Sequence, residues 1–161
     1  MGLNRVIWVI IGFLAWGIAV GMAGANPVWN QDDVTGLWWS PEKDSKIEIY
    51  PQGEGYYGKI VWIIPKSSGK LDAKNPDPQK RNQTLLGSDI FFDLKFDGKD
   101  TWKDGRLYDP KSGNFYQGYL KLKDKDDMEV SGFILTPLFG RSEKFKRVDL
   151  HDAETCEKSK F

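Results

Sequence analysis

Cysteine and histidine are almost absent from this chain of 161 residues, which contains one of each. A single cysteine cannot form an intramolecular disulfide, so the fold has to be stabilised by packing alone. Cys156 and His151 both lie in the polar segment 149–161, so no histidine-centred catalytic triad can form on the rest of the chain. The motifs HExxH, CxxC and the phosphate-binding glycine loop are also missing. We therefore expect a protein that is not an enzyme and that carries no cofactor or metal ion.

An excess of charge of either sign is also lacking, because 23 basic residues balance 23 acidic ones. The basic residues are interleaved with acidic ones along the chain and do not gather in a block. A chain of this kind has no net field that would attract a polyanion, so nucleic acid is not expected as a partner.

A long apolar run occurs once, at the N-terminus. Residues 6–22 carry no charge, follow Arg5, and are followed by the small residues Ala23-Gly24-Ala25. This layout is typical of a secretory signal peptide (1–25) cleaved after Ala25. An uncleaved anchor is the alternative, since the run is nearly long enough to span a bilayer. We expect cleavage, and hence a periplasmic or secreted bacterial protein with no membrane span.

Helical periodicity is missing from the remaining chain, where apolar residues alternate with a period of two. Examples are the faces Gly58, Ile60, Trp62, Ile64 and Ile90, Phe92, Leu94, Phe96. The predicted strands are 36–40, 45–50, 55–64, 86–96, 100–108, 114–123, 127–136 and 139–148, with turn residues between them. They predict one all-β domain (26–148), an up-and-down antiparallel barrel of about eight strands, because closure removes exposed edges. A β-sandwich is the alternative, and the polar tail 149–161 is predicted to be disordered.

The first and last predicted strands carry a matching pair of residues. Trp38 lies in a Gly-x-Trp motif on the first strand, and Arg141 and Arg147 lie on the last one. This resembles the lipocalin and streptavidin-like (calycin) arrangement, in which an arginine covers a tryptophan that plugs the closed end of the barrel. Arg147 suits this structural role better than Arg141 because it ends the strand. An ordinary core tryptophan is the alternative for Trp38.

A series of short motifs runs along the whole predicted domain. In chain order they are Gly36-x-Trp38, Gly58-Lys59-Ile60-Val61-Trp62, Asp72-x-x-Asn75-Pro76-Asp77-Pro78 with Arg81, Leu85-Leu86-Gly87, Trp102-x-x-Gly105-x-x-Tyr108-Asp109-Pro110-x-x-Gly113-x-x-Tyr116, Gly132, Phe139-Gly140-Arg141 and Arg147-Val148. This set of motifs is similar to that of the bacterial family called Domain of Unknown Function 2147. The resemblance covers about residues 34 to 148 and implies an exported protein with a lipocalin-like fold. It implies no activity, ligand or catalytic residue. Phe145 stands where we would expect a tryptophan.

The polar, proline-punctuated segment 71–87 is the predicted location of function, because loops of this length are unusual in small domains. We expect Asp72, Asn75, Asp77 and Arg81 to form either a lid over a barrel opening or a brace held by mutual hydrogen bonds. A calcium site is not predicted, since the spacing matches no EF-hand loop and Pro76 restricts how the oxygen ligands converge.

Aromatic residues make up 14% of the chain and offer a ligand-binding surface. The candidate ligand-binding residues, besides those of the 71–87 segment, are Tyr57, Trp62, Trp102, Tyr108, Tyr116 and Arg141. Each of these features has an alternative. The aromatic rings are equally able to fill the barrel, and the segment from Tyr108 to Gly113 also fits a simple hairpin turn. Arg81 and Arg141 could each bind an anionic ligand or form a salt bridge to Asp72, Asp77 or Asp109.

The sequence therefore predicts a non-enzymatic barrel that binds a small amphipathic or hydrophobic molecule in the cell envelope. The first alternative is a module that binds another envelope protein and has a closed, side-chain-filled barrel. The least supported alternative is a hydrolase that uses paired carboxylates.

Overall fold

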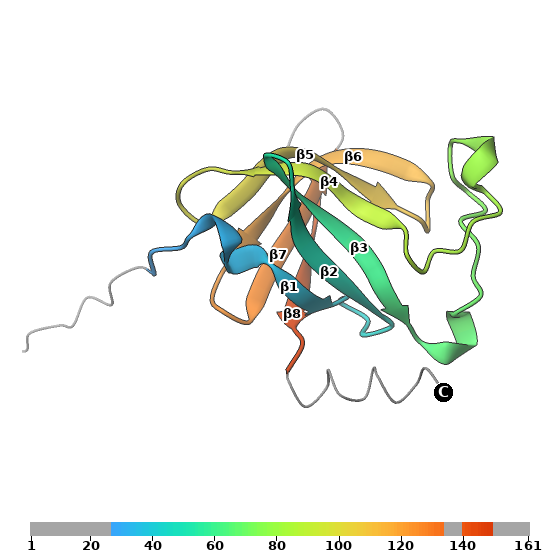
Figure 1. Ribbon diagram of the computed structural model, residues 1–161, viewed down its shortest axis with the longest axis horizontal. Coiled ribbons are helices and arrows are strands. Elements are labelled where there is room, and N and C mark those ends of the chain that lie inside the picture. Colours follow the sequence, from blue (N-terminus) through green and yellow to red (C-terminus); the bar gives the residue numbers. More distant parts are fainter. Residues whose placement is uncertain (1–26, 134–139, 150–161) are drawn as a thin grey trace, which may run out of the picture.

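Eight antiparallel strands close into a single barrel in the computed structural model, which describes residues 27–133 and 140–149 (Figure 1). The strands are β1 (Gly36–Trp39), β2 (Ser45–Gln52), β3 (Gly55–Ile63), β4 (Asp89–Phe96), β5 (Thr101–Asp109), β6 (Asn114–Leu122), β7 (Asp127–Phe133) and β8 (Gly140–Arg147). Each strand pairs with its neighbours in sequence, and β1 pairs with β8 through Trp38 opposite Arg147. The predicted up-and-down barrel is confirmed, and the sandwich alternative is wrong.

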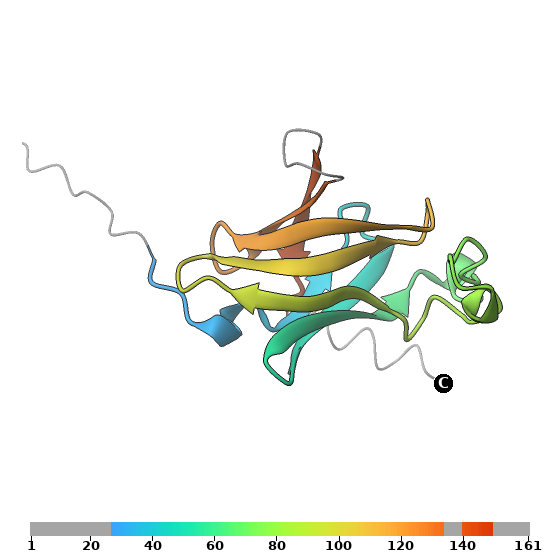
Figure 2. The ribbon, with the colours of Figure 1, turned by 90° about the horizontal axis from the view of Figure 1, so that it is seen from above.

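Three short 3-10 helices accompany the barrel: η1 (Gln31–Val34), η2 (Pro65–Ser67) and η3 (Pro78–Lys80). η1 and the 71–87 segment lie at opposite ends of the molecule in Figure 1 and Figure 2. No helix among the described residues is long and apolar enough to cross a membrane. Several predicted parts lie outside the described residues. They are the signal peptide (1–25), the first residue of the domain (26), residues 134–136 of the seventh strand, residue 139 of the eighth strand and residues 150–161 of the tail.

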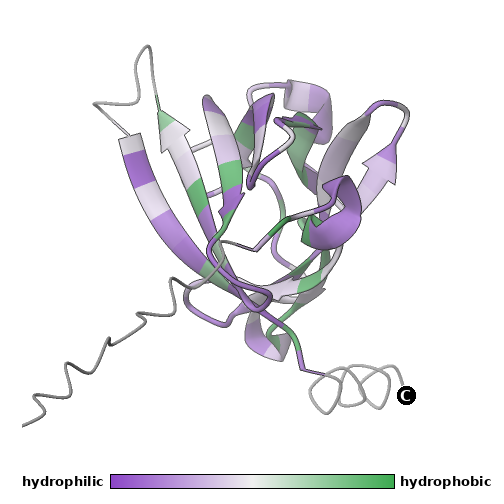
Figure 3. Ribbon diagram, turned by 90° about the vertical axis from the view of Figure 1, so that its left-hand side faces the viewer, coloured by the Kyte–Doolittle hydropathy of each residue, from purple (hydrophilic) through white to green (hydrophobic). Residues whose placement is uncertain are grey.

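The core fills the end of the barrel beside η1. Hydrophobic and hydrophilic residues alternate along the strands, as the end-on view of Figure 3 shows. Six inward side chains at this end are 0–2% exposed: Trp38, Leu94, Trp102, Leu120, Leu122 and Met128. Both indole N–H groups are satisfied, because Trp38 Nε1 donates to the Val34 carbonyl at 2.8 Å and Trp102 Nε1 donates to the Gln31 carbonyl at 2.9 Å. η1 therefore closes this end of the barrel.

Two β-bulges move predicted core rings to the outer surface. Ile47 pairs with Ile60 but Lys46 pairs with Trp62, so Val61 is an extra residue and Trp62 turns outward. The predicted Gly58, Ile60, Trp62, Ile64 face is therefore wrong at Trp62.

The second bulge lies in β4, where Asp93 has a φ of 54°. Tyr56 pairs with Leu94 while Gly58 pairs with Phe91, which puts one more residue on β4 than on β3. Phe91, which is 3% exposed, consequently packs inward against Phe145, with ring centroids 6.1 Å apart. The predicted inward position of Phe92 is wrong for this reason.

Candidate functional site

A cavity of about 720 Å³ occupies the end of the barrel opposite η1. Its apolar wall comes from strand residues that point inward: Ile47, Ile60, Ile63, Ile90, Phe91, Leu107, Val130 and Phe145. Its opening is bordered by the β1–β2 turn, the β5–β6 turn and the start of β8. A cavity of this volume is within the usual range of about 300–1,000 Å³ for small-molecule sites. The barrel is thus filled at one end and hollow at the other.

Charged side chains ring the opening of this cavity. The carboxylates are Glu42, Asp44, Asp109 and Glu143, and the cations are Lys70, Lys111 and Arg141. Arg141 Nη2 lies 2.9 Å from Glu143 Oε1, and Lys111 Nζ lies 2.9 Å from Glu42 Oε1. We refer to these seven residues as the rim.

The Lys111–Glu42 pair joins the β5–β6 turn to the β1–β2 turn, which are four strands apart around the barrel. It therefore reaches across the opening. The hydrogen bond to Glu42 raises the pKa of Lys111, and the carboxylates of Asp44 and Glu143 raise it further. Three carboxylates thus act on a single ammonium group.

Three of the predicted ligand-binding residues line the cavity: Tyr108, Tyr116 and Arg141. Tyr116 lies opposite Leu107 on the inward face of β6, and its hydroxyl is 3.3 Å from Ser112 Oγ. Arg141 forms a salt bridge, but its partner is Glu143 and not one of the aspartates considered from the sequence. The cavity is therefore lined by only some of the predicted ligand-binding residues.

Three other predicted residues do not line the described cavity. Trp102 is 0% exposed and lies in the closed end. Trp62 packs edge-on against Trp39 on the outer surface, with ring centroids 5.5 Å apart, because of the bulge at Val61. Tyr57 also faces outward, 6.4 Å from Phe92, since the preceding Tyr56 occupies the inward position. These three predicted residues therefore lie away from the cavity.

The 71–87 segment is held by its own hydrogen bonds. Asp72, 4% exposed, accepts hydrogen bonds from the Tyr108 hydroxyl and from Asn75 Nδ2, both at 2.6 Å. Asn75 Oδ1 accepts from the Asp77 amide at 2.9 Å, and the Asn75 carbonyl accepts from Arg81 Nε at 2.8 Å. Burial, with Asp72 adding to the effect, raises the pKa of Tyr108 well above its usual range. The four predicted residues therefore form a brace rather than part of the cavity wall.

The same segment is fastened to the β5–β6 turn. Lys74 Nζ donates to the Lys111 carbonyl at 2.7 Å. Gly113, with a φ of 77°, packs so closely on the Lys74 backbone that an added Cβ would collide with the Lys74 carbonyl. The segment therefore positions the turn that carries Lys111 at the opening.

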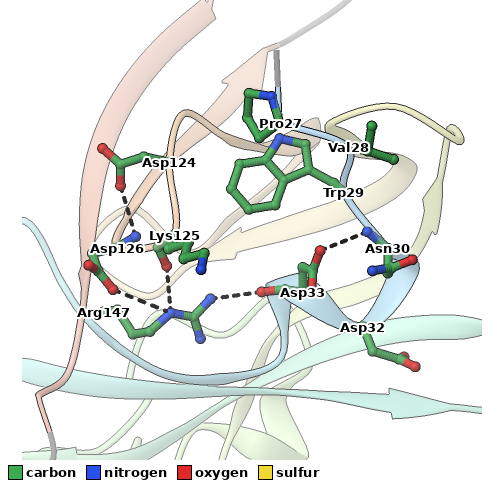
Figure 4. Close-up of a pocket in the computed structure, with 10 residues that line it drawn as sticks. All are labelled: Pro27, Val28, Trp29, Asn30, Asp32, Asp33, Asp124, Lys125, Asp126 and Arg147. Carbon is green, nitrogen blue, oxygen red and sulfur yellow. Dashed lines mark hydrogen bonds and ion pairs between the residues drawn. The ribbon is translucent and has the colours of Figure 1, made fainter. Parts of the chain in front are cut away.

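Arg147 closes the opposite end of the molecule (Figure 4). Its guanidinium carbon lies 4.1 Å from the centroid of the Trp38 ring. It donates at 2.7 Å to each of three carbonyls, those of Asp33, Thr35 and Lys125. Burial lowers the pKa of this group. Arg147, and not Arg141, thus has the position that the sequence assigned to the tryptophan cover.

A second hollow lies outside this closed end, between Trp29, Arg147 and the β6–β7 turn (Figure 4). Its carboxylates already serve protein donors. Asp33 Oδ2 accepts from the Asn30 amide at 2.7 Å, and Asp124 Oδ1 accepts from the Asp126 amide at 2.8 Å. The described residues contain no group of three or more metal-ligating side chains, here or elsewhere. The two carboxylates of this hollow are therefore engaged within the protein.

Comparison with known proteins identifies the family. A family model described as "Uncharacterized protein conserved in bacteria (DUF2147)" matches residues 36–147, more than half of the chain. The chain belongs to the DUF2147 family. A solved structure of HP1028 from Helicobacter pylori, described as belonging to the lipocalin family, is similar to this DUF2147 member with a TM-score of 0.64 and 23% sequence identity. The match covers 70% of this chain and 78% of that one, and at this identity it shows a shared fold. A search of curated proteins found no match.

Apart from Arg141, and Asp109 as a possible salt-bridge partner, the charged rim residues were missed from the sequence. A signal was available for Glu143, because Arg141, Glu143 and Phe145 alternate along the last strand and therefore face the same way. Glu42 and Lys111 lie in turns that are 69 residues apart in sequence. No local pattern joins such residues, so only the closed barrel reveals their contact.

Proposed function

We propose that this DUF2147 member is an exported, non-enzymatic binding protein that takes a small amphipathic molecule into the open end of its barrel. The observation that carries this proposal is the cavity of about 720 Å³, with apolar walls and a charged rim. Such an arrangement suits a molecule with an apolar body and a polar head. The lipocalin-like fold is consistent with this function.

The cell envelope is the proposed place of action. The support is the predicted signal peptide at 1–25, with its charge-free run and its Ala-x-Ala end. The alternative of a protein-binding module assumed a barrel filled by side chains. The cavity gives that alternative no support.

The rim carboxylates favour binding over catalysis. Glu42 and Glu143 are each paired with a cation, and Asp109 Oδ1 accepts from the Lys111 amide at 2.8 Å. Asp44 Oδ1 accepts from the Ser40 hydroxyl at 2.9 Å. Each of these four rim carboxylates is therefore already engaged by a donor of the protein itself.

A cavity-filling variant tests the proposal. Gly132 lines the cavity, and an added Cβ there would meet Tyr116 and Leu107 at ordinary contact distances. Gly132→Leu should therefore weaken binding of the neutral fluorophore N-phenylnaphthylamine about tenfold, which is about 1.4 kcal/mol. Gly132→Ala is the matched control and should change the Kd less than threefold.

Fluorescence titration measures both affinities, and urea unfolding shows that both variants are folded. Native mass spectrometry of the protein purified from its own envelope should reveal a bound small molecule. Unchanged fluorophore binding by Gly132→Leu, or no fluorophore binding by the natural protein, would overturn the proposal.

A further inference from the structure

We propose that the opening of the barrel contains a subsite for a cationic head group, and that the ammonium of Lys111 occupies this subsite in the free protein. The inference rests on the proposed function and specifies its ligand as an amphiphile with an amine head. Lys111 then acts as a built-in competitor that a ligand ammonium displaces.

The first support is the position of Lys111. Its Nζ is 2.9 Å from Glu42 Oε1 on the opposite side of the opening. Asp44, beside Glu42 in the β1–β2 turn, and Glu143 on β8 border the same opening, and their charges raise the pKa of Lys111 further. Carboxylates from two sides of the opening therefore act on this ammonium, and Glu42 is the one in direct contact with it.

The second support is the direction in which the rim charges point. The Arg141 side chain is 83% exposed, whereas its partner Glu143 is 38% exposed. The arginine therefore extends into solvent while the glutamate stays against the barrel, on the same inward row as Phe145. A ligand that enters the cavity passes the carboxylate more closely than the guanidinium.

The third support is the charge balance of the rim. Its described members comprise four carboxylates and three cations. Residues 134–139, which join β7 to β8, contain no ionisable side chain in their sequence. Removing the Lys111 ammonium would leave Glu42 without that ion pair and next to Asp44, whereas Glu143 would keep Arg141. The field at the opening would then favour a cation.

The fourth support is that Lys111 is easily displaced. The side chains of Lys111 and Glu42 are 66% and 62% exposed, and exposed ion pairs of this kind contribute little to stability. A ligand ammonium attached to an apolar chain would instead add the burial of that chain against the apolar wall to its ion pair with Glu42. Lys111 has no such chain to bury, so the ligand can displace it.

Three amphiphiles of equal chain length test the head-group preference: dodecylamine, dodecanol and dodecanoate. Each competes with N-phenylnaphthylamine for the natural protein at neutral pH, below its micelle concentration. We expect dodecylamine to bind about tenfold more tightly than dodecanoate, with dodecanol between them. This preference should decrease as the salt concentration rises.

Two variants locate the subsite. Lys111→Met removes the competing ammonium and keeps the apolar stem, so the affinity for dodecylamine should rise about threefold to tenfold while that for dodecanol stays level. Glu42→Gln should lower the affinity for dodecylamine by a similar factor. Lys99→Met is the matched control, because it removes one lysine charge from the β4–β5 turn at the other end of the barrel. It should leave the preference unchanged.

The outcomes separate this inference from the proposed function. If none of the three amphiphiles displaces the fluorophore, the proposed function fails with it. If dodecanol or dodecanoate binds as tightly as dodecylamine, the cationic subsite is wrong although the cavity binds amphiphiles. Loss of dodecanoate binding on Arg141→Met would then assign the head group to Arg141. If Lys111→Met does not fold, the Glu42→Gln result decides.

Discussion

At the scale of single residues, two arginines on the same strand have opposite roles. Arg147 covers Trp38 and donates to three carbonyls, whereas Arg141 is mostly exposed and has one ion-pair partner. Hydrogen bonds from a charged donor to part-buried carbonyls, as those of Asp33 and Thr35 are, contribute more than an exposed ion pair. The architecture therefore depends on Arg147 and not on Arg141.

Arg147→Met should lower the free energy of unfolding by about 2–4 kcal/mol, because it leaves the part-buried carbonyls of Asp33 and Thr35 without their donor and removes the guanidinium from the buried Trp38 ring. Arg141→Met is the matched control and should change it by less than about 0.5 kcal/mol. Urea unfolding measures both values. Equal effects of the two substitutions would contradict this assignment.

The pair of Trp38 and Arg147 was predictable from the sequence through its resemblance to the calycin arrangement. The structure shows this pair, since the first and last strands meet in the closed barrel. Trp62 and Phe92 were misplaced because one inserted residue in a strand reverses the side-chain alternation. Nothing in the local sequence shows on which side of the bulge the alternation resumes.

At the scale of elements, the 71–87 segment acts through the β5–β6 turn. Tyr108, Lys74 and Gly113 join the two, and the turn in turn carries Lys111 to the opening. The sequence singled out this segment by its polarity and its prolines. The sequence left open whether the segment is a lid or a brace. The hydrogen bond between Tyr108 and Asp72 decides this, and no local pattern predicts it because the two residues are 36 positions apart.

Gly113→Ala should detach the segment from the turn. Its Cβ would collide with the Lys74 carbonyl, in addition to the strain of a positive φ. Gly98→Ala is the matched control, since Gly98 has a φ of 84° and open space around its Cβ position. It isolates the backbone strain, about 1–2 kcal/mol.

Urea unfolding should show a loss for Gly113→Ala that exceeds the loss for Gly98→Ala by at least about 1 kcal/mol. Limited trypsin digestion should also cleave after Lys74, Lys80 or Arg81 faster in Gly113→Ala than in Gly98→Ala. Equal stability and equal cleavage of the two variants would show that the close contact is unimportant.

At the scale of the whole molecule, the barrel has a filled end and a hollow end. Two tyrosines also hydrogen-bond β2 and β3 to other segments of the chain. Tyr56 donates to Asp32 of η1 at 2.6 Å, and Tyr50 donates to Asp89 at 3.0 Å. Burial raises the pKa of each hydroxyl to about 12, and the neighbouring carboxylate adds to the effect. The barrel itself was predictable, because eight alternating runs separated by turn residues permit few other closed arrangements.

Alkaline pH should therefore destabilise the protein. Below pH about 10 these tyrosines are protonated in both states, so they contribute no pH dependence. Between pH about 10 and 12 the unfolded chain loses the protons first, and the free energy of unfolding falls. Lysine titration contributes in the same range. The Tyr50→Phe/Tyr56→Phe variant should accordingly show a smaller fall than the natural protein.

Urea unfolding at several pH values measures this fall, and the absorbance of tyrosinate follows the titration directly. In the folded protein part of that absorbance should appear only near pH 12, whereas in guanidinium chloride it should appear near pH 10. Identical pH profiles of the natural protein and the double variant would contradict the role of these two hydroxyls.

Barrel closure also imposes an order on folding. The Arg147 bond to Thr35 joins residues 112 positions apart, and β1 finds its second partner only in β8. Contacts of such long range form slowly, since a large loop has to close first. A chain that crosses a membrane N-terminus first, as the proposed export requires, would thus lack its final strand until the end of passage. Because β1 and β8 cannot pair before β8 arrives, the barrel would stay unclosed while the chain is still crossing the membrane.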